Sequence, residues 1–171
     1  MTTEIAQFMR KLERRWDDHL EALFIRRDVD AAMAHMTAAT SVRHIPTMTG
    51  ADGRPELEHF YRDVVLPHLP GDLGFTRRSR TVDRFHLVDE LTVSFVHDCE
   101  MPWLIPGIEP TGRHAAVAAI VVVDFDRGAI ASQRTLWDGA SLAAQLGVTV
   151  GPPQTHATRM TAGAHRPVER I

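Results

Sequence analysis

The carboxylate of Asp138 is a candidate both for acid–base chemistry and for a structural role at the start of a helix. Asp138 follows a strand-like segment, 130–137, and precedes SLAAQL, which is typical of a short helix. A carboxylate at the mouth of an apolar pocket has its pKa raised by burial, so it can move a proton between the carbon atoms of an enol or enolate. A carboxylate that caps a helix has its pKa lowered instead. We expect Asp138 to be a catalytic acid or base, and the capping role stays an open alternative.

Strand alternation selects two further candidates, because residues two apart share a face. Ser132, Arg134 and Leu136 then share the face of Asp138. The planar guanidinium of Arg134 makes charge-assisted hydrogen bonds, so we expect it to hold an oxyanion or carboxylate of a ligand; an exposed arginine is the alternative. His97 interrupts the apolar face of an earlier strand, where an imidazole is suited to act as a general base or hydrogen-bond donor. A core histidine bonded to the backbone is the alternative there.

The remaining candidates are a histidine at a loop and a set of aromatic rings. His44 ends the first strand-like segment, just before a proline and a glycine-rich loop, and we expect it to assist catalysis at a pocket rim; a structural role in the loop is equally open. Large rings with one polar atom suit the walls of a substrate site. The expected wall residues are Trp16, Tyr61, Trp103 and Trp137. Core packing is the alternative for Trp16, and Trp103 is placed to act as a lid.

Ten histidines raise the question of a metal site, and HDCE at 97–100 places four potential ligands in a row. Adjacent residues of a strand point to opposite faces, so these four cannot converge on one ion. The sequence has no helical HExxH, paired CxxC, phosphate-loop or dinucleotide-binding motif. We therefore predict neither a metal ion nor an organic cofactor.

The predicted elements that position these residues are mainly helices in the first part of the chain and mainly strands in the second. Helical spacing of apolar residues predicts a first helix over 3–27, a second capped by Asp28 or Asp30, and a third from Pro55 to Pro67. Residues rich in Val, Thr, Ile and Phe predict strands over 40–45, 76–87, 91–101, 114–125 and 130–137. Turns are expected at VDE, 88–90, and DRG, 126–128, and a last helix over 141–146 before Gly147. Helices followed by a meander of strands predict an α+β fold with a mainly antiparallel sheet on three or four helices.

Composition favours one ordinary globular domain over 1–147 with a tail over 148–171 that carries few large apolar groups. The net charge of −3 gives no reason to expect nucleic acid as a partner. The longest apolar run, 115–123, is too short to span a bilayer, so no membrane partner is expected. The single Cys99 and the charged start MTTEIAQFMRKLERRW predict a cytoplasmic protein.

Three segments resemble the SnoaL-like branch of the nuclear transport factor 2-like superfamily: HIPTMTGADGRPELEHFY at 44–61, MPWLIPGIEPTGR at 101–113 and WDGASLAAQLG at 137–147. The resemblance implies a curved sheet that wraps around a pocket as a cone or partial barrel, commonly in homodimers. It also places Asp138 at the acid–base position of the SnoaL-like polyketide cyclases. The sequence departs from that pattern on the last strand, where Gln133 and Arg134 replace the Glu and His that this branch more often carries.

These observations together predict a protein with a pocket for a small, mostly apolar, oxygenated molecule such as a polyketide, lactone or terpenoid ketone. We expect a cofactor-independent enzyme in which Asp138 moves a proton, His97 and Arg134 anchor the oxygen, and His44 assists at the rim. The alternative is a protein that binds a small ligand without catalysis, or a dimerisation module. An inward-pointing Asp138 in a deep pocket would favour the enzyme.

Overall fold

The computed structural model describes residues 2–149, so the predicted tail lies almost wholly outside the described residues. The helical elements are α1 (Thr2–Leu20), the π-helical η1 (Glu21–Ile25), α2 (Val29–Met33), α3 (Arg54–His59), the π-helical η2 (Phe60–Val65), the short 3-10 helix η3 (Leu66–His68) and α4 (Gly139–Leu146). The strands are β1 (Met36–Ile45), β2 (Gly50–Asp52), β3 (Gly74–Val82), β4 (His86–Val96), β5 (His114–Asp126) and β6 (Ala129–Trp137). Among these residues, no helix combines the length and apolar character needed to cross a bilayer.

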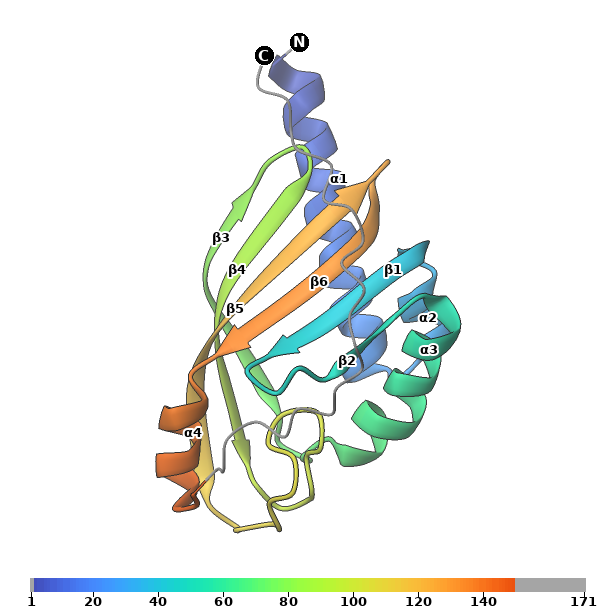
Figure 1. Cartoon of the computed structure of the whole chain (residues 1–171). Helices are drawn as coiled ribbons and strands as arrows, with labels where there is room; N and C mark the ends of the chain where they lie inside the picture. Colours follow the sequence, from blue (N-terminus) through green and yellow to red (C-terminus); the bar gives the residue numbers. More distant parts are fainter. Residues whose placement is uncertain (1, 150–171) are drawn as a thin grey trace.

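The sheet has the strand order β2-β1-β6-β5-β4-β3. Four of its neighbouring pairs are antiparallel, while β1 and β6 run parallel, so the sheet is mixed, and it is open rather than closed into a barrel. Figure 1 shows the sheet strongly curved, with α1 lying across one face and α2 and α3 beside β1. The predicted α+β architecture is confirmed.

The helical half forms largely as the residue spacing predicts. The first helix ends at Ile25, close to the expected Arg27, and buries Leu12 and Trp16 against the sheet. Asp28 caps α2, where its side chain accepts a hydrogen bond from the backbone N–H of Ala31 at 2.9 Å.

One predicted turn is wrong and one is confirmed. The chain reverses between β3 and β4 at 83–85, because the Asp83 carboxylate accepts hydrogen bonds from the backbone N–H groups of Phe85 and His86 at 2.6 and 2.7 Å. The segment expected to turn, 88–90, lies inside β4 instead. The turn at 126–128 is present, with Arg127 and Gly128 at φ values of 48° and 81°.

A bulge near the start of β6 decides which side chains face inward. Asp124 of β5 pairs with Ser132, whereas the next residue of β5 pairs with Ile130, so β6 carries one extra residue there. Beyond the bulge the inward set is Gln133, Thr135 and Trp137. The outward set is Ser132, Arg134 and Leu136, the reverse of the predicted assignment.

The last helix docks where β5 extends beyond β6. Asp138 caps α4, and Gly147 ends it in the left-handed conformation at φ 68°, so both predicted boundaries are confirmed. The side-chain amide of Gln145 pairs with both backbone groups of Ala116, accepting from its N–H at 2.8 Å and donating to its carbonyl at 3.0 Å. Gln145 thus provides hydrogen-bond partners for the backbone N–H and carbonyl of a β5 residue that lies beyond the end of β6.

Candidate functional site

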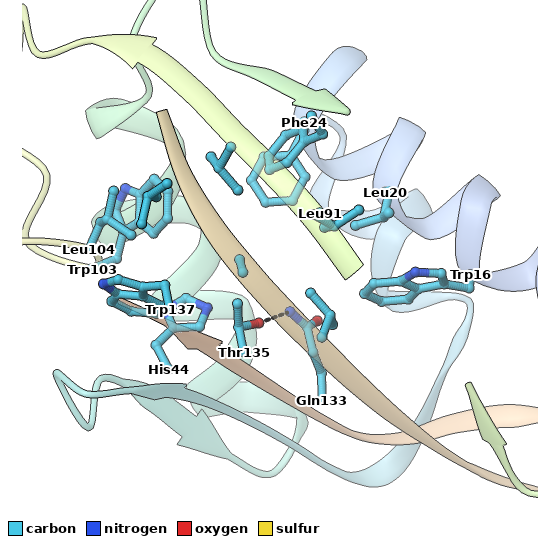
Figure 2. Close-up of a pocket in the computed structure, with 15 residues that line it drawn as sticks. Trp16, Leu20, Phe24, His44, Leu91, Trp103, Leu104, Gln133, Thr135 and Trp137 are labelled. Carbon is cyan, nitrogen blue, oxygen red and sulfur yellow. Dashed lines mark hydrogen bonds between the residues drawn. The ribbon is translucent and has the colours of Figure 1, made fainter. Parts of the chain in front are cut away.

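An apolar cavity of about 60 Å³ lies between the inner face of the sheet, the first helical segment and the loop that joins β4 to β5. Aromatic and aliphatic side chains form most of its wall, and the polar groups come from β1 and β6 (Figure 2). The aromatic wall residues are Trp16, Phe24, Phe75, Trp103 and Trp137. The polar lining residues are His44, Gln133 and Thr135, so Asp, Glu, Lys and Arg are all missing from the described lining.

His44 is positioned by the tight connection between β1 and β2. The backbone N–H of His44 donates to the carbonyl of Thr49 at 2.8 Å, which folds Thr49 back over the histidine. The following residue must be glycine, because a Cβ on Gly50 would stand 2.0 Å from the carbonyl oxygen of Val42. The glycine loop therefore serves to bring a threonine hydroxyl against the His44 ring.

The hydrogen bonds around His44 fix its tautomer. The Thr49 hydroxyl donates to the carbonyl of Trp103 at 2.9 Å, and its oxygen lies 3.3 Å from Nδ1 of His44. Since the hydroxyl proton is committed to the carbonyl, Nδ1 carries the proton in the bond to Thr49, and Nε2 keeps its lone pair. Figure 2 shows the ring projecting into the pocket between Trp137 and Thr135.

Burial keeps the imidazole of His44 neutral. Desolvation lowers its pKa to about 4, and the charge of Arg43 adds to this effect, while the nearby Trp103 carbonyl partly opposes it. The side chain is 7% exposed. At neutral pH the pocket therefore holds an uncharged nitrogen base.

Gln133 and Thr135 form a polar strip beside His44 on the neighbouring strand. The Cα atoms of His44 and Thr135 are paired across β1 and β6. The Gln133 amide donates to the Thr135 hydroxyl oxygen at 3.1 Å, so the Thr135 hydroxyl proton remains available to a ligand. Gln133 Oε1 is buried and accepts no hydrogen bond from the described residues.

The pocket wall on the side of α1 is held by a buried ion network. The indole N–H of Trp16 donates to the Asp89 carboxylate at 2.9 Å, and Arg80 donates to the same carboxylate at 2.6 and 2.7 Å. Arg80 also donates to Asp17 at 2.8 Å. Burial opposes the charge of Arg80, but its bonds to Asp89 and Asp17 outweigh this and raise its pKa above the usual range.

The sequence matches no family model and no curated protein. The structure is similar to a candidate SnoaL-like polyketide cyclase from Jannaschia sp. CCS1 (TM-score 0.67, 14% identity, covering 83% of this chain and 95% of that one). It is also similar to a nuclear transport factor 2-like protein of unknown function from Burkholderia pseudomallei (TM-score 0.62, 17%, 80% and 97%). This chain has the nuclear transport factor 2-like fold. The same fold occurs in an LEH-like epoxide hydrolase from M. tuberculosis (TM-score 0.58, 16%, 81% and 90%).

Within this fold, Asp138 lies outside the pocket. Its side chain is exposed and accepts a hydrogen bond from the backbone N–H of Ser141 at 2.9 Å, so the helix-capping alternative describes its position. Of the predicted catalytic residues, His44 alone lines the cavity.

Arg134 and His97 also lie away from the cavity. Arg134 points from the outer face, where it forms an ion pair with Asp124 at 3.2 Å and its side chain is 48% exposed. Ser132, Arg134 and Leu136 do share a face, as predicted, but Asp138, from which that face was assigned to the pocket, points outward. His97 follows the end of β4, beyond the pocket, and its Nδ1 accepts a hydrogen bond from the backbone N–H of Thr111 at 3.3 Å. The alternative of a buried histidine bonded to the backbone describes His97.

The predicted aromatic wall is present apart from one member. Trp16, Trp103 and Trp137, which are all the tryptophans of the chain, line the pocket. Trp103 is held as a wall because its indole N–H donates to the carbonyl of His68 at 3.0 Å. Tyr61 is buried but does not line the cavity, and its ring lies near that of His19 instead.

Sequence reasoning missed the polar strip and one side of the pocket. Gln133 and Thr135 share a face with Trp137, and that spacing was the available signal. Phe24 and Phe75 face each other with ring centroids 5.0 Å apart, from segments 51 residues apart in sequence that no local pattern joins. Within 2–149, no three His, Cys, Asp or Glu side chains are grouped as metal ligands.

Proposed function

We propose that the protein binds a small, mostly apolar, oxygenated molecule in this cavity and that His44 transfers a proton on it. The observation that supports this proposal is the neutral imidazole of His44, with the lone pair on Nε2, inside a mainly apolar pocket. This histidine replaces Asp138 in the predicted mechanism, because Asp138 lies outside the cavity.

The proposed reaction needs only groups that line the pocket. Nε2 of His44 removes a proton from carbon next to a carbonyl group, and the electrons of the broken C–H bond move onto the carbonyl oxygen. The Thr135 hydroxyl donates a hydrogen bond to that oxygen as it gains charge. When the ligand carries a C=C bond one carbon further from the carbonyl, the anion extends over that bond, and the imidazolium returns the proton to its far carbon. The carbonyl re-forms, the double bond moves next to it, and the ligand is isomerised without net change in composition.

Non-catalytic binding of a small ligand is the second candidate. It is favoured by the absence of any charged side chain from the described lining and by the small cavity, since pockets for drug-sized ligands commonly measure about 300–1,000 Å³. A histidine with a pKa of about 4 is also a weak base. Catalysis and binding must therefore be measured separately.

The test uses small cyclic ketones as probes, because the natural ligand is unidentified. Binding is followed by intrinsic fluorescence, since every tryptophan of the chain lines the pocket. Proton transfer is followed by NMR as exchange of the protons next to the carbonyl into deuterated water. We expect the wild-type protein to accelerate exchange and His44→Gln to lose this activity while its affinity changes by less than about threefold.

Arg134→Gln is the matched control, because it alters a polar side chain on the outer face of the same sheet. Exchange at the wild-type rate in His44→Gln would remove His44 from the mechanism. Binding of the ketones without exchange in the wild-type protein would support the second candidate instead.

We also propose that two copies of the chain associate through the outer face of the sheet. Ile120 of β5 and Leu136 of β6 lie opposite each other there, and each is 39% exposed. Ala116 and Ala118, which have small side chains, are exposed on the adjoining surface. Sedimentation is expected to show a dimer for the wild-type chain and a monomer for Ile120→Glu, and a wild-type monomer would contradict this proposal.

A further inference from the structure

Two buried polar side chains lie directly behind the Trp16 wall of the pocket. His19 of α1 is fully buried and stacks on Trp16, with ring centroids 5.4 Å apart and an angle of 17° between the rings. Tyr61 of η2 is 2% exposed, and its ring centroid lies 6.2 Å from that of His19. Nε2 of His19 and the hydroxyl of Tyr61 have no hydrogen-bond partner within the described part of the chain.

The chemistry of the two orphan atoms is complementary. Nδ1 of His19 lies 3.0 Å from the carbonyl oxygen of Ala32, and because a carbonyl only accepts, the proton is on Nδ1. Nε2 is therefore an acceptor, and burial lowers the His19 pKa to about 4, so the ring stays neutral. Burial raises the pKa of Tyr61, so its hydroxyl keeps its proton and offers both a donor and an acceptor.

The sheet face that these helices cover carries two more orphan polar atoms. Thr40 Oγ1 and Gln133 Oε1 are buried without a described partner. Val42 pairs with Gln133, and Thr40 is two residues from Val42, so Thr40 and Gln133 project from the same face of adjacent strands. Gln133 also lines the pocket, as Trp16 does (Figure 2). Thr40 and Gln133 therefore add two buried polar atoms on one face of the sheet, and Gln133 places one of them at the pocket wall.

We propose that His19, Tyr61, Thr40 and Gln133 form a buried binding site for a neutral hydroxyl group behind the Trp16 wall. A hydroxyl group matches this set, because it can donate to Nε2 of His19 or to Oε1 of Gln133 and accept from Tyr61 or Thr40. An ion does not match it, because no charged partner is among the four residues and burial of an unpaired charge is costly. The hydroxyl belongs either to an internal water or to a pocket ligand, and the second source rests on the proposed function.

The sign of the stability change in Tyr61→Phe tests the site in the free protein. A buried hydroxyl without a partner destabilises the folded state, so its removal from a vacant site raises the urea midpoint. When a water is bound, the same substitution removes a hydrogen bond and lowers the midpoint. Because Tyr61 is the only tyrosine, selective ¹³C labelling at its Cζ gives a single NMR signal that reports the hydrogen bonding of this hydroxyl.

A pair of probes tests the second source of the hydroxyl group. Cyclohexanone and 4-hydroxycyclohexanone differ by one hydroxyl, and we expect the hydroxylated probe to bind the wild-type protein roughly fivefold to tenfold more tightly. In Tyr61→Phe this advantage is expected to disappear while the affinity for cyclohexanone is unchanged. His86→Gln, on the exposed turn side of β4, is the control for a polar substitution elsewhere.

A lower urea midpoint in Tyr61→Phe supports a site occupied by water. Loss of the tighter binding of 4-hydroxycyclohexanone in Tyr61→Phe supports a site occupied by a ligand hydroxyl. An equal or higher midpoint with no change in discrimination between the probes overturns it. Failure of both ketones to bind the wild-type protein counts against the proposed function, and the stability of Tyr61→Phe then decides the buried site alone.

Discussion

Two histidines in this chain are neutral because of where the fold places them. His19 and His44 are each tied through Nδ1 to an acceptor, a backbone carbonyl for His19 and the Thr49 hydroxyl for His44. Desolvation lowers the pKa of both to about 4. In each case the second ring nitrogen is left as a buried acceptor, which is the property used in both proposals above.

The depressed pKa of His44 predicts how stability depends on pH. The unfolded chain takes up a proton near pH 6.5, whereas the folded chain resists it until about pH 4. The unfolded state therefore binds more protons between these values, and the contribution of His44 is complete above pH 6.5 and lost as pH falls toward 4. As the pH falls from 6.5 to 5, the unfolding free energy of the wild-type protein decreases, in part because of His44. We expect this decrease to be about 2 kcal/mol smaller in His44→Gln, measured by urea titration.

His114→Gln is the control for this pH prediction, because it removes an exposed histidine at the start of β5. The prediction fails when both variants lessen the decrease equally. The His19→Gln variant is expected to behave as His44→Gln does, since the pKa of His19 is lowered to the same value by burial.

At the scale of the element, the start of α4 shows that an aspartate expected to act in catalysis can instead cap a helix. The motif 137–147 forms a capped helix whose start and end match the prediction. The same motif placed Asp138 at an acid–base position by resemblance, yet the carboxylate faces outward and bonds the first turn. The motif thus predicts the backbone of this helix but not the direction in which its carboxylate points.

Substitutions at Asp138 separate these roles. Asp138→Ala is expected to lose about 1 kcal/mol of unfolding free energy, because a backbone N–H at the start of α4 loses its acceptor. Asp138→Asn is expected to retain the cap and most of the stability. Ketone proton exchange should match the wild-type rate in both variants, and a loss of exchange in Asp138→Asn would return this residue to the mechanism.

Gln145 tests how α4 is docked. Its amide makes two hydrogen bonds to the backbone of Ala116, so Gln145→Ala leaves a strand N–H and carbonyl without these partners. We expect a loss of about 1–2 kcal/mol in thermal or urea unfolding. Ala144→Gln, one residue earlier on the exposed side of α4, is the matched control and should change stability by less than about 0.5 kcal/mol.

At the scale of the whole molecule, one ion network joins the first helix to the far strands of the sheet. Arg80 of β3 bonds Asp89 of β4 and Asp17 of α1, and the same carboxylate of Asp89 holds Trp16 in the pocket wall. The side chains of Arg80 and Asp89 are only 9% and 1% exposed. Removing Arg80 therefore leaves the Asp89 carboxylate buried without its cation. Removing Asp89 leaves Arg80 without this partner and also takes away the acceptor that holds Trp16 in the pocket wall.

Arg80→Met is expected to lower the unfolding free energy by about 3–5 kcal/mol, because it leaves the Asp89 carboxylate buried and unpaired. Adding Asp89→Asn should recover part of this loss, since it removes the charge and keeps an acceptor for Trp16. Arg77→Met is the control, because Arg77 contacts Asp17 at 3.3 Å with its side chain 49% exposed, and it should cost less than about 1 kcal/mol. Equal losses in Arg77→Met and Arg80→Met would contradict a buried network.

The sequence alone determined the properties that depend on neighbours along the chain. Helical spacing set the first helix, Asp28 and Asp138 marked helix starts, Gly147 marked an end, and the turn at 126–128 followed from its residues. These features are local because each is decided by hydrogen bonds or conformational preferences within a few residues. The three tryptophans of the pocket wall also followed, since large rings are generally buried.

The tertiary structure decided which of those residues meet. One extra residue in β6 reversed the faces of Arg134 and Gln133, and no local pattern reveals a bulge that is set by pairing with β5. The residue that lines the cavity is His44 rather than Asp138, because a loop folds Thr49 onto this imidazole while the carboxylate turns outward to a helix. The faces of β6 rest on its pairing with β5, and the cavity that His44 enters is closed by Trp103 from a distant loop. The energies of these contacts between distant segments are absent from any short stretch of sequence.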